Sequence, residues 1–237
     1  MVSKNSQLSI TYLKHASLMI KDIDNWILID PIFFDLWLYN DFSPLAFDIE
    51  KMPKPHYILI THGHYDHLDT SSLKLFKEHS HVITPLGYDD LFDGFDRTQL
   101  DWFNAYKDQH REITLIPCDH WTMRHPFLDY NSSLWGSFII KTLSGPTLFI
   151  SGDCAYSNRF QEIGKEFSID LAIFNLGAYE PRWFMEKNHM NPPEVVQAFK
   201  QLNARHLMVV HWGTFRLGDE PVYFPPLAIR RKMKNAG

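Results

Sequence analysis

The 237-residue sequence predicts a fold of the α/β or α+β class, in which helices cover β-sheets. Short β-branched and aromatic runs outnumber helical patterns, and the helical patterns are spread between these runs. Apolar residues make up 45% of the chain and charged residues 22%, a composition that excludes the disordered and fibrous classes. No repeat or flexible linker divides the chain, so we expect a single domain over residues 1–237.

Turn residues and periodicity place the expected elements along the chain. The expected strands are Leu8–Leu13, Ser17–Lys21, Trp26–Ile29, Tyr57–Ile60, Ile113–Pro117, Ser137–Thr142, Thr147–Ser151, Leu171–Phe174 and His206–Val210. The expected helices are Ser71–His79, a segment after Ser157 through Phe167, and Pro192–Leu202. The last helix has the clearest start, because Asn191 is a suitable N-cap and Glu194 complements the helix dipole.

Charge and hydropathy exclude several classes of function. Lys and Arg number 23 and Asp and Glu 28, which gives a net charge of −5 and no global basic field for a nucleic acid. No apolar run approaches the roughly 20 residues that span a bilayer, and Met1–Ile10 lacks the apolar stretch of a signal peptide. Cys118 and Cys154 are too few for a disulfide framework. We therefore expect a soluble, cytoplasmic protein.

Histidine is enriched, with 13 residues, and four potential metal ligands fall between positions 62 and 67. The segment reads His62-Gly63-His64-Tyr65-Asp66-His67 and follows an apolar strand. We expect His62 and His64 to reach one metal, because alternate residues at a strand end point the same way. Asp66 and His67 then suit a second, adjacent metal. Imidazole with some carboxylate favours Zn²⁺, while Mn²⁺ and Fe²⁺ remain open.

Four local ligands do not complete two metal sites, so further ligands must come from other strand ends. His120, Asp153 and His211 each follow an apolar strand and supply the missing ligand types. Together with the cluster at 62–67 they predict a site for two divalent ions.

These residues resemble a known family. The His-x-His-x-Asp-His segment is similar to the signature of the metallo-β-lactamase superfamily. Further segments resemble the branch that contains N-acyl-phosphatidylethanolamine-hydrolysing phospholipase D and its bacterial relatives, namely Gly152–Tyr156, Gly177–Met185, His189–Pro192 and His211–Phe215. The likeness extends from about Ile10 to Phe224, although Cys154-Ala155 stands where the branch usually has Thr-Gly.

The resemblance implies a four-layer αβ/βα sandwich with a dinuclear metal site at one edge of its two sheets. It assigns His62, His64 and His120 to the first metal, Asp66, His67 and His211 to the second, and Asp153 to a bridge between them. It also places His15 and Asp30 near the site, where their hydrogen bonds would orient the ligands.

Two divalent ions acidify a shared water, so hydroxide forms near neutral pH and hydrolysis is the expected reaction. Asp66 would orient that water or receive its proton. In the resemblance His189 lies by the active site, where it would bind a substrate phosphate or protonate a leaving oxygen. Residues around these positions are candidates for substrate contacts, namely Tyr179, Glu180, Arg182 and Trp183.

We expect the substrate to be a phosphodiester or lipid-like phosphate. The alternatives are a lactonase or other carbonyl-ester hydrolase and a ribonuclease-like processing enzyme. A non-enzymatic alternative is a protein whose metals serve folding alone.

The basic run Arg230–Lys234 is expected to be a solvated tail. The phospholipase-like proteins have a longer N-terminal region that helps them meet membranes, whereas this chain starts almost at the first expected strand, which argues against membrane docking. The sequence indicates no oligomeric state.

Overall fold

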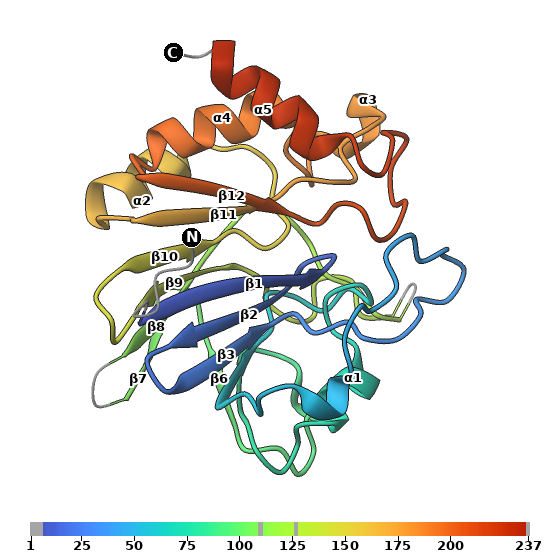
Figure 1. Ribbon diagram of the computed structural model, residues 1–237, viewed down its shortest axis with the longest axis vertical. Helices are drawn as coiled ribbons and strands as arrows, with labels where there is room; N and C mark the ends of the chain where they lie inside the picture. The colour runs from blue at the N-terminus through green and yellow to red at the C-terminus, as the bar shows by residue number, and fades with distance from the viewer. Residues whose placement is uncertain (1–6, 109–110, 126–127, 236–237) are drawn as a thin grey trace.

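The computed structural model describes residues 7–108, 111–125 and 128–235, which form two six-stranded sheets that pack face to face (Figure 1). The first sheet has the order β1 (Leu8–Lys14), β2 (Ser17–Asp22), β3 (Asn25–Ile29), β4 (Tyr57–Leu59), β5 (His81–Pro85) and β6 (Arg97–Leu100). The second has the order β12 (His206–Val210), β11 (Leu171–Asn175), β10 (Thr147–Ile150), β9 (Ser137–Lys141), β8 (Glu112–Ile116) and β7 (Ala105–Lys107).

Both sheets are mixed. Strands β1, β2 and β3 are antiparallel, and β3 to β6 are parallel. In the second sheet β10, β11 and β12 are parallel, while β7 to β10 alternate in direction, so that β8 runs the same way as β10. Strands that run in the same direction end at the same edge of their sheet. The segments that follow β3 and β4 therefore leave from one edge of the first sheet, and those that follow β8, β10, β11 and β12 leave from one edge of the second.

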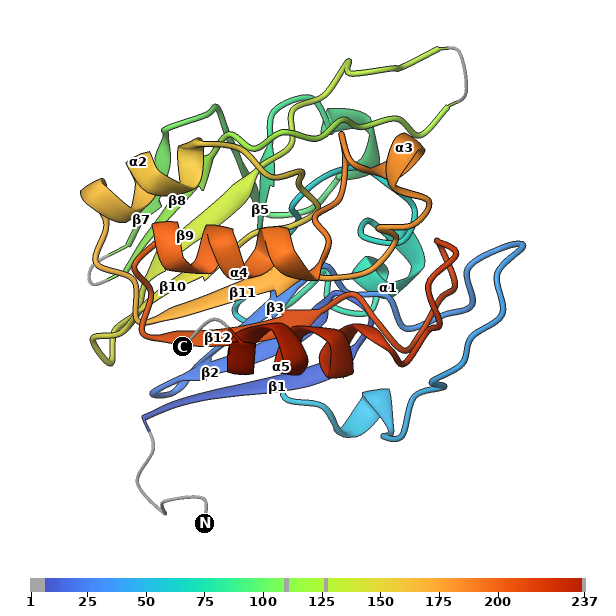
Figure 2. The same ribbon diagram turned by 90° about the horizontal axis from the view of Figure 1, so that it is seen from above.

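Helices cover the outer faces of the sheets. The helices are α1 (Thr70–Lys74), α2 (Arg159–Glu166), α3 (Arg182–Met185), α4 (Pro192–Gln201) and α5 (Pro225–Asn235), with short 3₁₀ turns at Ile49–Lys51 and Asp89–Leu91. Helices α2, α4 and α5 lie over the second sheet, and α1 lies beside the first (Figures 1 and 2). Asn191 and Glu194 form a capping box that fixes the start of α4.

Alternating side chains divide the core into layers. On β2, Leu18 and Ile20 face the second sheet, whereas Met19 packs into the outer cluster with α1. On β10, Leu148 faces the first sheet and Phe149 packs under the helices. The expected α/β sandwich is therefore confirmed, with one apolar layer between the sheets and one outside each of them.

The nine expected strands are present, and three others were not expected. Strand β5 ends in proline, β6 is mostly polar and β7 has only three residues, so none gives a strong periodic signal. The expected helix Ser71–His79 is wrong in extent, because α1 ends at Lys74 and the chain continues in turns.

The expectation of a solvated tail at Arg230–Lys234 is also wrong. This run belongs to α5, which buries Ala228 and Ile229 while its basic side chains remain exposed. Across the described part of the chain, every helix is too short or too polar to span a lipid bilayer.

Candidate metal centre

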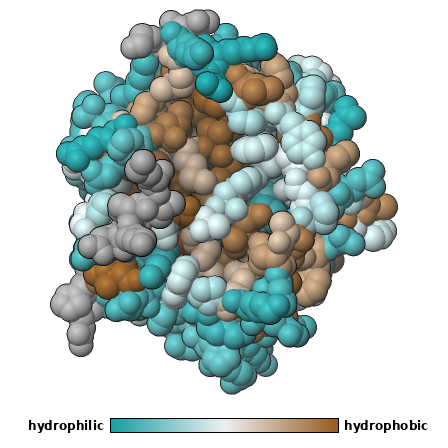
Figure 3. Space-filling model, in the orientation of Figure 1, coloured by the Kyte–Doolittle hydropathy of each residue, from teal (hydrophilic) through white to brown (hydrophobic). Residues whose placement is uncertain are grey.

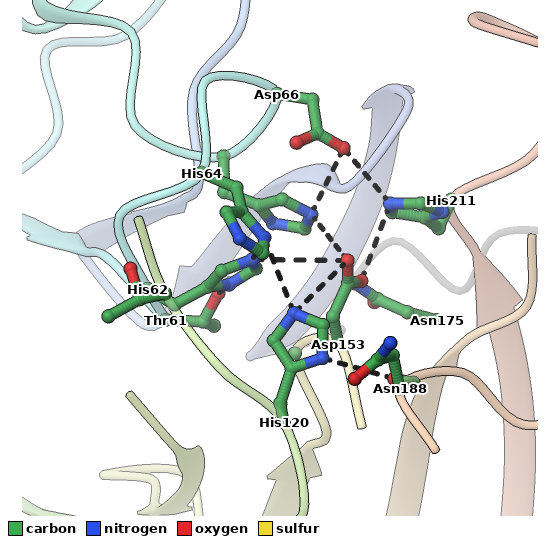
Figure 4. Close-up of polar contacts among 12 residues, drawn as sticks. Thr61, His62, His64, Asp66, His120, Asp153, Asn175, Asn188 and His211 are labelled. Atoms are coloured by element: carbon green, nitrogen blue, oxygen red, sulfur yellow. Dashed lines mark hydrogen bonds and ion pairs between the residues drawn. The ribbon is translucent and has the colours of Figure 1, made fainter. Parts of the chain in front are cut away.

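All seven side chains expected to bind metal converge at the edge where the two sheets meet (Figure 4). The first sheet supplies the loop after β4, and the second sheet supplies the segments after β8, β10 and β12. The backbone N–H of His211 donates to the carbonyl of His15 at 2.7 Å, which ties the end of β12 to the start of β2. The two sheets are thus joined beside the site.

The first ligand group consists of His62, His64, His120 and Asp153, whose ligand atoms all lie within 4.8 Å of one another. His62 Nε2 lies 2.9 Å from His64 Nδ1, and His120 Nε2 lies 3.3 Å from the same atom. Asp153 Oδ2 lies 3.9 Å from His62 Nε2 and 4.0 Å from His120 Nε2.

The second group consists of His15, Asp66, His67 and His211 within the same limit. Asp66 Oδ2 lies 3.0 Å from His15 Nε2, 3.3 Å from His211 Nε2 and 3.5 Å from His67 Nε2. Asp153 reaches this group as well, because its two oxygens lie 3.3 Å from His67 Nε2 and from His211 Nε2. Asp153 therefore stands between the two groups.

Close packing explains the glycines beside these ligands. A Cβ on Gly63 would lie 2.7 Å from Tyr88 Cε1 and 2.8 Å from Thr122 Oγ1, so no larger residue fits between His62 and His64. A Cβ on Gly177 would lie 2.0 Å from the carbonyl oxygen of His211. Both positions allow the ligand-bearing loops to approach their neighbours closely.

Asp30 sets the orientation of one histidine in each group. It is buried after β3 and accepts from the Thr61 N–H at 2.8 Å and from Thr61 Oγ1 at 2.6 Å. His67 Nδ1 lies 2.8 Å from Asp30 Oδ2 and must carry a proton, because a carboxylate only accepts. The Thr61 hydroxyl gives its proton to Asp30 and accepts from His62 Nδ1 at 3.0 Å. Both histidines therefore direct Nε2 towards the site.

Two asparagines that sequence reasoning missed complete these contacts. Asn175 donates from Nδ2 to Asp153 Oδ1 at 2.7 Å, and the carbonyl of Asn188 accepts from His120 Nδ1 at 3.1 Å. Asn175 ends the apolar strand β11, so its position at a strand end was an available signal. Asn188 acts through its backbone, for which the side-chain type gives no signal.

Burial and neighbouring charges set the ionisation of the site. Burial lowers the pKa of His62, His64 and His120, which keeps these imidazoles neutral, as metal binding requires. Burial alone would raise the pKa of Asp153, but the neighbouring histidines hold it well below its usual range. His67 is the exception, because the carboxylates of Asp153 and Asp66 outweigh burial and raise its pKa well above the usual value.

The donor set fits two divalent cations. Donors around a tetrahedral zinc ion at about 2.1 Å stand roughly 3.4 Å apart, and the spacings here run from 2.9 to 4.0 Å. His67 Nε2 is buried without a hydrogen bond although two carboxylates lie within 3.5 Å, so it points at a common centre rather than at either partner. His62 Nε2 and His120 Nε2 both approach His64 Nδ1, at 2.9 and 3.3 Å, although one N–H can serve only one of them, so a cation would satisfy all three nitrogens.

His189 lies beside both groups. Its Nδ1 is 3.8 Å from Asp153 Oδ2, and its ring centroid is 5.4 Å from that of His120. Burial lowers the pKa of His189 to about 4, so the imidazole is neutral at pH 7.

The other residues expected near the substrate occupy different environments. Tyr179 is buried and its hydroxyl has no hydrogen-bond partner. Arg182 Nη2 lies 3.0 and 2.9 Å from the two carboxylate oxygens of Glu194, and Nη1 donates to the carbonyl of His189 at 2.8 Å, which supports the loop that carries His189. Glu180 accepts from the Arg182 N–H, whereas Trp183 is 80% exposed on α3.

Comparisons with known proteins agree with this geometry. Residues 25–212 match the family described as "Beta-lactamase superfamily domain". The chain is 35% identical over 211 residues to the mitochondrial N-acyl-phosphatidylethanolamine-hydrolyzing phospholipase D of Saccharomyces cerevisiae, which covers 82% of this chain but only 45% of that protein. It is 29% identical to N-acyl-phosphatidylethanolamine-hydrolyzing phospholipase D 1 of Caenorhabditis elegans, over 97% of this chain and 69% of that one.

A solved structure shares the fold. It is the metallo hydrolase Igni18 from the archaeon Ignicoccus hospitalis, with a TM-score of 0.74 at 20% identity. The match covers 97% of this chain and 91% of Igni18.

Proposed function

Since the chain belongs to the beta-lactamase superfamily and is a metal-dependent hydrolase of that fold, we propose that it binds two zinc ions and hydrolyses a phosphodiester bond in a lipid-like substrate. The observation that carries this proposal is the place of Asp153, whose carboxylate lies within 4.0 Å of histidines from both ligand groups. A carboxylate shared by two groups is the arrangement that a pair of adjacent cations requires.

We assign one ion to each of the two ligand groups described above. His62, His64 and His120 would hold the first ion, Asp66, His67 and His211 would hold the second, and Asp153 would be shared between them. We assign His15 to positioning rather than ligation, because its Nε2 hydrogen-bonds the Asp66 carboxylate at 3.0 Å. Asp30 acts in the same way on His67.

When bound, the two cations supply Lewis acidity, which polarises the scissile group and lowers the pKa of water towards neutrality. The residues of the chain supply the rest. Asp66 is ionised, because histidines hold its pKa well below the usual range, and its 14% exposed side chain is within reach of solvent. We propose that Asp66 orients the attacking water and accepts its proton.

His189 is proposed to contact the substrate phosphate. A neutral imidazole offers one N–H donor and one acceptor, and its side chain is 15% exposed beside Asp153. It can therefore donate a hydrogen bond to a phosphoryl oxygen, where negative charge increases during the reaction. To transfer a proton to the leaving oxygen, His189 would first have to take up a proton from solvent, which an anionic substrate favours because its charge raises the pKa of the imidazole.

The substrate class rests on the named relatives and on the surroundings of the site. The yeast and nematode relatives are named for hydrolysis of N-acyl-phosphatidylethanolamine, a phosphodiester lipid. Trp121 packs against His64 with ring centroids 4.5 Å apart, so an apolar wall adjoins the first ligand group. The net charge of −5 argues against RNA as the substrate.

A substrate panel on the metal-loaded protein tests the proposal. Elemental analysis should find two equivalents of zinc, and hydrolysis should be seen with phosphodiesters, including a phospholipid, but not with lactones or carboxylic esters. Turnover of lactones alone would establish a carbonyl hydrolase instead, and inactivity on the whole panel would refute the proposal. Chelation should abolish turnover while far-ultraviolet circular dichroism shows that the fold remains, because loss of the fold would indicate structural metals.

A further inference from the structure

Six large apolar side chains on three segments at the carboxyl edge of the sheets are each at least 59% exposed. They are Trp37 at 83%, Leu38 at 78%, Leu128 at 85%, Tyr130 at 64%, Trp183 at 80% and Phe184 at 59%, and we call them the apolar rim. The first pair lies on the segment after β3, the second after β8 and the third on α3 after β11. Each pair therefore projects from the sheet edge that carries the metal centre.

Hydrogen bonds and ring contacts tie each pair to a ligand-bearing segment. The loop with Trp37 and Leu38 is anchored where the Phe42 N–H donates to the carbonyl of Thr214, and the hydroxyl of Ser43 donates to the carbonyl of Gly213, two residues after His211.

The Tyr130 ring lies against Trp121 with centroids 5.6 Å apart, and Trp121 itself packs edge-on against His64. On the third side, Arg182 at the start of α3 donates to the carbonyl of His189. The three pairs thus flank the site on three sides.

The composition of the rim is that of a lipid-contacting surface. Trp and Tyr combine an apolar ring with a polar group and are enriched where water meets acyl chains. Between Phe34 and Asn40 only Asp35 is charged, and the nearby cation Lys14 is paired with Asp41. In the space-filling view, the projecting right-hand edge where this loop lies carries brown and pale atoms beside teal ones (Figure 3).

We propose that the apolar rim inserts into the interfacial layer of a neutral or zwitterionic lipid surface, with the metal centre facing the headgroups. The proposal rests on the lipid-like substrate proposed above and names how that substrate is presented. A protein seated across all three loops would cover the site, whereas a lipid layer delivers substrate to it. This proposal is opposed to the expectation from sequence that the chain does not dock on membranes, and the experiment below decides between them.

Sedimentation of the metal-loaded protein with phosphatidylcholine vesicles tests the docking directly. We expect binding that persists at about 0.5 M salt, roughly three times physiological ionic strength, since no charge pairing is involved. The double variant Trp37→Ser, Leu38→Asn should weaken binding at least about tenfold. Asparagine suits position 38 because its φ is +70°, and both side chains are solvent-exposed, so the melting temperature should not change.

Two matched variants serve as controls. Leu75→Ser removes an exposed apolar side chain on the segment that ends α1, outside the rim, and should bind vesicles like the wild type. The double variant Arg230→Gln, Arg231→Gln removes exposed charge from α5 and should also leave binding unchanged.

Activity separates this inference from the proposed function. With a water-soluble phosphodiester below any micelle concentration, the rim variant should match the wild type, whereas with vesicle-borne phospholipid it should lose at least about tenfold in rate. Vesicle binding without hydrolysis of any phosphodiester would retain the docking surface and refute the proposed function. Hydrolysis of the soluble ester by a protein that does not sediment with vesicles would overturn the docking proposal. Binding restricted to anionic vesicles and abolished by salt, or a dimer that the rim variant dissociates, would overturn it as well.

Discussion

Replacement of Asp30 by asparagine should weaken metal binding although Asp30 is not a proposed ligand. Asp30 accepts three hydrogen bonds, two from Thr61 and one from His67 Nδ1. An amide has one accepting oxygen and one donating nitrogen, so either orientation of the new side chain places a donor against a donor. Because the Thr61 backbone N–H cannot give up its proton, we expect the amide oxygen to face it, which places the amide nitrogen against Thr61 Oγ1 and His67 Nδ1. Neutral His67, the form that binds metal, then relieves the conflict by carrying its proton on Nε2, the nitrogen directed towards Asp66 and Asp153.

The size of the effect follows from these contacts. Loss of a partner that orients a metal-binding histidine costs roughly 10- to 100-fold in metal affinity, or about 1.4 to 2.8 kcal/mol. The metal-free fold should also lose about 1.5 to 3 kcal/mol, because a buried charge-assisted hydrogen bond is replaced by a mismatch. Since His67 belongs to the second group, the affinity for the ion in that group should fall most.

Asp22→Asn is the matched control. Asp22 is fully buried at the far end of β2, accepts from the N–H groups of Leu143 and Ser144 at 2.7 and 3.0 Å, and pairs with the buried Arg111 at 3.4 Å. Asp22→Asn should lose at least as much stability as Asp30→Asn, because it leaves the Arg111 charge without its partner, but metal affinity should not change.

Competition with a chromophoric zinc chelator measures the zinc affinity of each of the two sites in the wild type and in both variants. Denaturant unfolding of the metal-free proteins measures their free energies of unfolding. An Asp30→Asn protein that binds two zinc ions as tightly as the wild type, or that loses no more affinity than Asp22→Asn, would refute the tautomer argument.

Three further outcomes are expected. Asp153→Ala should leave at most one bound metal by elemental analysis and lower kcat/KM more than about 100-fold, and full activity would contradict the bridging role. Gly63→Ala should cost about 1 to 3 kcal/mol in thermal unfolding, because the new Cβ would lie 2.7 Å from Tyr88 Cε1, and an unchanged Tm would show that the loop yields freely. The raised pKa of His67 implies that the metal-free protein holds a proton there at pH 7, so zinc binding should release about one proton and strengthen as pH rises. Calorimetry in buffers of different ionisation enthalpy measures that release, and the absence of any buffer dependence would contradict it.

The same raised pKa has a defined effect on the stability of the metal-free protein. The contribution of protonated His67 is fully present below the unfolded pKa of about 6.5 and is lost as pH rises through the raised folded value. Acid works in the opposite direction through Asp66 and Asp153, whose contributions are present above the unfolded pKa and are lost as pH falls.

Much of the architecture was predictable because strand ends are visible in the sequence. His120, Asp153 and His211 each follow an apolar strand, and strands that run in the same direction bring such ends to one edge. The structure does bring all seven expected ligands together, whereas their occupancy by metal stays a prediction. Asn175 follows the same rule but was missed, because amide side chains are common at turns without any ligand role.

The remaining features depend on tertiary contacts that no local pattern encodes. The carbonyl of Asn188 acts on His120 from 68 positions away. Helix α5 was mistaken for a tail because its charges dominate the local composition, although Ala228 and Ile229 are buried. The short polar strand β6 exists because β5 offers it a parallel partner rather than through any propensity of its own.

The division of the ligands between the sheets links cation uptake to the assembly of the sandwich. The first sheet alone presents four of the seven proposed donors, and the second presents three, so neither half holds a complete pair of coordination shells. Each ion would bind ligands from both sheets and so stabilise the state in which the sheets are packed together. The added free energy would grow with the logarithm of the free ion concentration relative to its dissociation constant. The free zinc concentration would therefore set the stability of the folded protein as well as its rate of hydrolysis.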